Sequence, residues 1–167
     1  MDEGHHLAQL NIGRVRHPLD HPEMRGFVEQ LDYINAIADA STGFVWRLQT
    51  EDGNATAFRP FGEDDMLANM SVWKSVEALY DYTYRSDHLA VMRGRRQWFE
   101  PLGSPHMVLW WIPAGHIPTL EEAIERLERL RRNGPTPDAF DFRQPYGTDG
   151  RMLRLRGHQD WASCDAG

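Results

Sequence analysis

The sequence has a single cysteine, Cys164, so no intramolecular disulfide can form and a disulfide-stapled secreted scaffold is excluded. It also has no apolar run long enough to cross a bilayer. The first residues, MDEGHHLAQLNIG, are acidic and lack the apolar centre of a signal peptide. From these absences we expect a cytoplasmic protein.

The chain also lacks an excess of positive charge. It has 25 acidic against 18 basic residues, for a formal net charge of −7. Nucleic-acid binding normally needs a basic face, so this balance argues against it. The longest basic stretch, residues 126–132, has acidic residues interleaved at helical spacing and is typical of a solvated helix face.

Several catalytic signatures are missing as well. The sequence contains no G-x-S-x-G, no G-x-G-x-x-G, no phosphate-binding loop and no H-E-x-x-H. Hydrolase, kinase and nucleotide-dependent functions therefore have no support from motifs.

The composition itself is that of one packed domain. Of 167 residues, 41% are hydrophobic and 11% aromatic, with six tryptophans. So many indole rings suit either a core or a pocket for a flat, apolar ligand. We expect one domain over residues 1–146, followed by a flexible extension over residues 147–167, where the hydrophobic periodicity fades.

Alternating or aromatic-rich segments predict four strands, at residues 7–13, 43–51, 66–73 and 106–113. Helical periodicity follows the first strand, starting at Pro22, and follows the third strand after Ser75, a plausible N-cap. A last helix runs from the capping box of Thr119 and Glu122 to Gly134.

The predicted order, βαββαβ with one added C-terminal helix, is the ferredoxin-like plan of the α+β class. With helices on one face of the sheet, the other face would need a cover, usually a second copy of the sheet, so we expect a homodimer. We expect that uncovered face to carry mixed polar and aromatic side chains: Gln9, Asn11, Val45, Arg47, Gln49, Asn69, Ser71 and Trp73. A small-molecule pocket, a polar dimer interface or a sheet face open to water would each fit this pattern.

Seven colinear segments carry a family resemblance: HLAQLNIG, GFVWRL, NMSVWKSVEAL, YRSDH, RRQWF, LWWIPAGHIPT and NGPTPDAFDF. Together, from about His6 to Pro145, they resemble a bacterial family catalogued as domain of unknown function 3291. That family belongs with the dimeric α/β-barrel superfamily. Other members of that superfamily include antibiotic-biosynthesis monooxygenases, haem-degrading monooxygenases, chlorite dismutases, dye-decolourising peroxidases and aldoxime dehydratases.

The resemblance implies a dimeric α/β barrel. It implies chemistry only at the level of the superfamily, because a fold hosts many reactions. The family offers no established catalytic residue to carry over.

His88 is the most prominent candidate residue. On a continuous helix, Tyr80, Tyr84, His88 and Met92 are successive (i, i+4) neighbours on one mostly apolar face. Three roles remain open for this histidine. It is a hydrogen-bonded core residue, an acid/base whose ordinary pKa suits proton transfer near neutral pH, or the axial ligand of a haem. Arg96 extends the same row and is a candidate partner for a carboxylate.

A metal site has weaker support. His17 and His21 have the H-x₃-H spacing, but two prolines place them in a loop and no third ligand is evident. We therefore predict no metal site, apart from His88 if haem is bound.

The sequence thus leads to three hypotheses: a monooxygenase-like enzyme acting on a small hydrophobic or aromatic metabolite, a haem-binding barrel, and a non-catalytic ligand-binding or structural dimer. For the enzyme we assign His88 and Arg47 as catalytic, the arginine offsetting substrate charge. The expected substrate-binding residues are Gln9, Asn11, Trp46, Asn69, Ser71, Trp73, Tyr84, Met92, Arg96 and Trp111.

Overall fold

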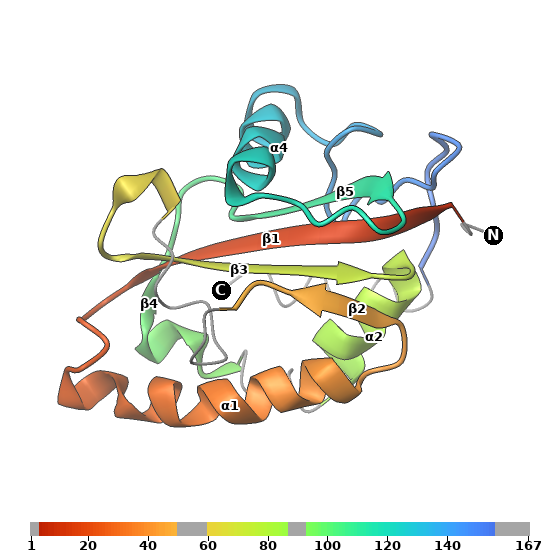
Figure 1. The fold of residues 1–167 in the computed structure, drawn as a ribbon. Coiled ribbons are helices and arrows are strands. Elements are labelled where there is room, and N and C mark those ends of the chain that lie inside the picture. The colour runs from red at the N-terminus through yellow and green to blue at the C-terminus, as the bar shows by residue number, and fades with distance from the viewer. Residues whose placement is uncertain (1–3, 50–59, 87–92, 156–167) are drawn as a thin grey trace.

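The computed structural model describes residues 4–49, 60–86 and 93–155, and its centre is an antiparallel five-stranded sheet (Figure 1). The strands are β1 (His5–Val15), β2 (Phe44–Arg47), β3 (Met66–Trp73), β4 (Phe99–Glu100) and β5 (Met107–Pro113). The main helices are α1 (Arg25–Ala40), α2 (Val76–Arg85) and α4 (Leu120–Asn133). Short 3₁₀ turns lie at η1 (Pro22–Met24), η2 (Pro60–Gly62) and η3 (Arg95–Gln97).

Strand β1 is the centre of the sheet. It pairs with β3 on one side, and on the other with β5 along most of its length and with β4 at its end. Strand β2 adds to the outer edge of β3. The order β2–β3–β1–β5 with antiparallel pairing confirms the ferredoxin-like α+β fold, to which β4 and α4 are additions.

Helices cover both faces of the sheet. Helix α4 packs on one face, against a core that includes Leu10, Met70 and Trp110. Helices α1 and α2 lie on the opposite side, as Figure 1 shows. The sequence predicted that the polar face of the sheet would be bare of helices. In the structure that polar face is covered by α1 and α2, and the apolar face is covered by the added helix α4.

Strand β2 departs from regular alternation because a bulge shifts its register between Phe44 and Trp46. Phe44 packs edge-on against Trp73, with ring centroids 5.4 Å apart. Trp46 turns to the other side and packs on the α4 core. The prediction that these two residues share a face was therefore wrong, since the bulge inserts one residue between them.

The helix that begins after Ser75 does not continue through residues 80–100; the sequence also allowed a break at the RSD segment, and the structure has one there. Ser75 caps α2 by accepting the Ala78 N–H, as predicted, but the helix ends at Arg85. Ser86 adopts an extended backbone there, and its hydroxyl donates to the Tyr82 carbonyl. Phe99 belongs to β4 and pairs with Val15, so the segment after η3 is strand.

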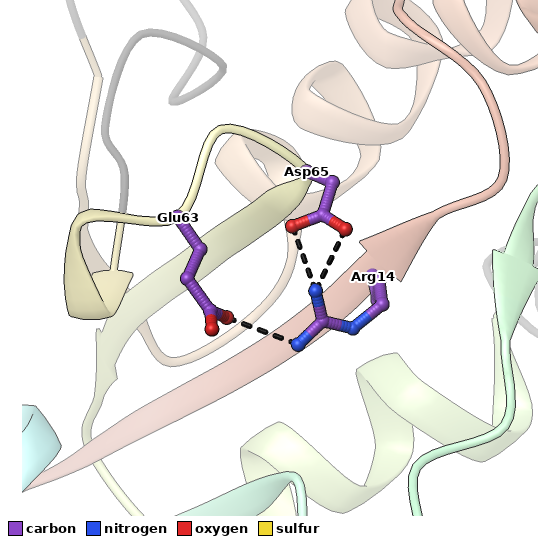
Figure 2. A network of polar contacts seen from close by, with 3 residues as sticks. All are labelled: Arg14, Glu63 and Asp65. Carbon is purple, nitrogen blue, oxygen red and sulfur yellow. Dashed lines mark hydrogen bonds and ion pairs between the residues drawn. The ribbon is translucent and has the colours of Figure 1, made fainter.

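Two loops are fastened to the sheet. Arg14, near the end of β1, donates two 2.7 Å hydrogen bonds to Asp65 and one of 3.0 Å to Glu63, which holds the turn before β3 (Figure 2).

The segment after α4 is attached to the sheet at Phe140, which exchanges backbone hydrogen bonds with Leu109 of β5. Leu153 N–H donates to the Pro145 carbonyl, and Leu155 is buried beside Phe142. Packing thus continues past residue 147, up to Leu155.

Candidate functional site

A cavity of about 480 Å³ lies between the sheet and the α2 side of the molecule. Four parts of the chain build it: the sheet, α2 with η3, the loop before β5, and the segment after α4. Its described lining residues are Gln9, Asn11, Asn69, Leu79, Tyr82, Thr83, Tyr84, Arg95, Leu102, Gly103, Ser104, Pro105, His106, Met107, Asp141, Phe142 and Arg143. A volume of this order suits a small-molecule ligand.

The floor of the cavity is a set of amide side chains on β1 and β3. Asn11 and Asn69 are directly opposite partners in the register, which brings their Cβ atoms to roughly 5 Å. Asn69 is exposed although it lies in the middle of an inner strand, so the sheet is open to a ligand at this point. Apolar side chains would be expected at such positions if the face were only a core.

A buried hydrogen-bond chain sets the direction of the Asn69 amide. Gln9 Nε2 donates to Asn69 Oδ1 at 2.7 Å and to Ser71 Oγ at 2.9 Å. Trp73 Nε1 donates to the same Ser71 oxygen at 2.8 Å. Because the Asn69 oxygen is engaged by Gln9, its Nδ2 group is the end presented to the cavity.

Aromatic rings form the α2 wall. Tyr82 stacks on Trp73 with ring centroids 4.9 Å apart, and Tyr84 packs against Phe142 at 5.6 Å. Burial raises the pKa of the Tyr82 phenol far above its ordinary value. The positive charge of Arg47 lowers this pKa, and the negative charge of Asp39 raises it further, but both effects are smaller than that of burial. The phenol therefore stays protonated near neutral pH and offers a neutral O–H group.

The end of β1 carries the cationic part of the lining. Arg95 Nη2 donates to the Ile12 carbonyl at 3.3 Å, and its guanidinium lies 5.3 Å from the Phe99 ring centroid. Nearby, the Ile12 N–H donates to the His106 carbonyl at 2.9 Å, which fixes the loop before β5. Arg95 and His106 are thus both lining residues close to Asn11.

The structure brings some of the predicted site residues together at this cavity. Gln9, Asn11, Asn69 and Tyr84 line it, while Ser71 and Trp73 lie directly behind the floor in the hydrogen-bond chain. His88 and Met92 lie outside the described residues.

Four other predicted residues have different surroundings. Arg47 forms a two-point ion pair with Asp39, with its side chain only 13% exposed, next to Tyr82. Trp46 is on the α4 side of the sheet, and Arg96 is exposed. The Trp111 indole donates to the Tyr146 carbonyl at 2.8 Å and so fastens the C-terminal segment.

Sequence reasoning missed the lining residues Arg95, His106, Asp141 and Arg143. Arg96 was chosen in place of Arg95 because a continuous helix was assumed through a stretch that forms a 3₁₀ turn. The other three residues sit in loops whose contacts with the sheet leave no periodic signal in the sequence. The NGPTPDAFDF segment was noticed only through the family resemblance.

The described ranges contain no group of three or more histidine, cysteine or acidic side chains that could hold a metal ion. His17 and His21 stack on each other at 4.3 Å, and His17 Nε2 lies 3.0 Å from Glu23 Oε2. Among the residues described, no helix is long and apolar enough to cross a membrane.

The chain shows distant likeness to solved structures. SnoaB, a cofactor-independent oxygenase from Streptomyces nogalater, has 15% identity and a TM-score of 0.42, with 67% of this chain and 95% of that chain covered. PA3566 from Pseudomonas aeruginosa has 11% identity and a TM-score of 0.42, with coverages of 68% and 95%. A dabb family protein with a ferredoxin-like fold from Mesorhizobium loti has 17% identity, a TM-score of 0.39, and coverages of 70% and 98%.

No functionally curated protein matches the sequence. A family model does match, over residues 6–155. Its description is "Domain of unknown function (DUF3291)", and because the match spans most of the sequence, the chain belongs to this family.

Proposed function

We propose that this protein is a monooxygenase-like enzyme that binds a small hydrophobic or aromatic metabolite in the cavity between the sheet and α2. One observation carries the proposal. The same cavity combines a floor of amides, Asn11 and Asn69, with a wall of aromatic and apolar side chains. A few placed hydrogen-bonding groups among large apolar surfaces is the usual composition of a small-molecule site.

Oxygenation of a substrate anion by O₂ needs from the protein mainly a binding cavity and hydrogen-bond donors placed near the anion. An activated CH₂ group next to an aromatic ring can lose a proton to form an anion that reacts with O₂. One oxygen atom becomes a carbonyl on that carbon, and the other leaves as water with the two hydrogens, so the substrate itself supplies all four electrons that reduce O₂. Donors aimed at the anion stabilise the charge that develops, which lowers the barrier.

In this proposal the Nδ2 groups of Asn11 and Asn69 orient the oxygen of the substrate anion. Gln9, Ser71 and Trp73 act behind them by holding the Asn69 amide in position. The role of His88 as the proton acceptor stays a prediction from the sequence.

The test is oxygen uptake with a panel of small aromatic ketones and phenols that have an acidic C–H or O–H. We expect uptake by the wild type, and in Asn69→Ala a loss of kcat/KM of about tenfold or more, corresponding to about 1.4 kcal/mol of transition-state stabilisation. Asn133→Ala, at the exposed end of α4, is the matched control and retains wild-type rates.

Two outcomes would count against the enzyme. One is tight binding of panel compounds without any oxygen uptake, which favours a ligand-binding protein. The other is uptake that Asn69→Ala leaves unchanged, which places the reaction elsewhere. Circular dichroism of the variant separates a lost contact from a lost fold.

A further inference from the structure

Arg95 lies in the 3₁₀ turn η3, and its side chain reaches the cavity by packing against β1. Its guanidinium lies on the end of β1, where Nη2 donates to the Ile12 carbonyl at 3.3 Å. Gly13 of β1 lies beside this guanidinium, and the Phe99 ring packs directly against it. A Cβ there would come within 2.7 Å of the Phe99 ring and 3.4 Å of Arg95 Nη2. The side chain is thus held over the cavity side of β1.

Asn11 is the next residue on that same side of the strand. Residues two apart on a strand point to one face, so Asn11 lies on the same side of β1 as Gly13, beside which the Arg95 guanidinium packs. Asn69 lies directly opposite Asn11 on β3 and turns its Nδ2 toward the cavity. One end of the cavity therefore gathers a cation and two amide donors.

Asp141 contributes the one carboxylate among the described lining residues, against the guanidinium groups of Arg95 and Arg143. Its Oδ1 already accepts the backbone N–H groups of Arg143 and Gln144, at 2.9 and 3.1 Å. Two guanidinium groups against one carboxylate among the described lining residues favour an anionic ligand.

The lining also contains apolar side chains, among them Leu79, Met107 and Phe142. We infer that the natural ligand of this cavity is an aromatic carboxylate. Arg95 binds the carboxylate at the end of the cavity next to Asn11, and the ring lies against the apolar side chains. This inference rests on the proposed function in using the same cavity, and it adds the charge class of the substrate.

The test compares two probes of equal shape, naphthalene carboxylate and the corresponding neutral naphthalene carboxamide, by isothermal titration calorimetry. The wild type should bind the carboxylate at least about tenfold more tightly than the amide, because charge-assisted hydrogen bonds exceed neutral ones. Arg95→Gln should lose that preference. Arg96→Gln, its exposed neighbour in the same 3₁₀ turn, is the control and should keep it.

Salt and a conservative variant keep the test decisive if Arg95→Gln folds poorly. Raising the salt concentration should weaken carboxylate binding to the wild type and leave amide binding unchanged. Arg95→Lys keeps the charge but not the planar fork, and should retain part of the preference. The inference is overturned by equal affinities for the two probes, by no binding of either, or by a preference that survives in Arg95→Gln.

These measurements need no turnover, so they separate the two proposals. A carboxylate preference without oxygen uptake in the panel supports the inference and contradicts the oxygenase. Oxygen uptake on neutral compounds, with equal binding of the two probes, overturns the inference and leaves the oxygenase standing.

Discussion

At the scale of single residues, Ser71 connects the core to the cavity. Its hydroxyl oxygen is the common acceptor for Trp73 Nε1 and Gln9 Nε2, and the serine itself is only 5% exposed. An indole N–H can only donate, so the tryptophan depends on that oxygen. The direction of the Asn69 amide therefore depends on a side chain that no ligand would touch.

We predict that Ser71→Ala destabilises the protein by about 1–3 kcal/mol, because buried donors on Trp73 and Gln9 lose their acceptor. Urea unfolding followed by tryptophan fluorescence measures the change. Ser104→Ala, in the exposed loop before β5, is the control and should leave the midpoint where it is. An unchanged free energy of unfolding in Ser71→Ala would show that another group takes over the two donors.

At the scale of elements, the decisive junction is where β1, β4 and η3 meet. Strand β4 is only two residues long, yet its pairing with β1 holds Phe99 over Gly13. Phe27 of α1 packs edge-on against the same ring, with centroids 5.1 Å apart. The ring is thus confined from two sides and has little room to yield.

We predict that Gly13→Ala destabilises the fold by about 1–3 kcal/mol through overpacking against Phe99. It should also displace Arg95 and lower the preference for naphthalene carboxylate over the amide. Thermal unfolding and the same calorimetric titrations measure both effects. Gly103→Ala provides the comparison, since nothing lies within 4 Å of its new methyl group. Wild-type stability in Gly13→Ala would mean that the ring moves aside at little cost.

Local signals predicted the elements whose stability is local. Thr119 accepts the Glu122 N–H at 3.1 Å and Gly134 ends α4 with a φ of 70°, as the capping pattern indicated. The alternation of β1 predicted its two faces. Long-range effects were not visible: the bulge in β2 separates Phe44 and Trp46 onto different faces, and Arg95 is placed by contacts with β1. These depend on partners far away in the sequence.

At the scale of the whole molecule, the α4 side of the sheet retains apolar surface. Trp46 and Leu48 are only partly buried against the core there, and Phe61, beside Arg131 of α4, is 42% exposed. Grouped apolar surface of this kind is a common feature of subunit interfaces. We propose that two copies associate through this side, which differs from the polar sheet face that the sequence predicted for the homodimer contact.

Light scattering on a size-exclusion column tests this association. We predict a mass twice the 19.3 kDa of the chain, and a shift toward the monomer in Phe61→Glu, which places a charge in the interface. Tyr33→Glu, on the exposed side of α1, is the control and should leave the dimer intact. A wild-type mass of one chain, or a dimer that only Tyr33→Glu disrupts, would contradict the proposal.

The cavity draws its lining from Gln9 near one end of the described chain to Arg143 near the other. The ribosome must therefore synthesise the chain through Arg143 before the cavity is complete, although β1 and α1 are synthesised early. Contacts between such distant parts form late and slowly in folding. A nascent chain stalled before Phe140 would hold the floor and the α2 wall without Asp141, Phe142 and Arg143, so ligand binding reports completed synthesis of the domain.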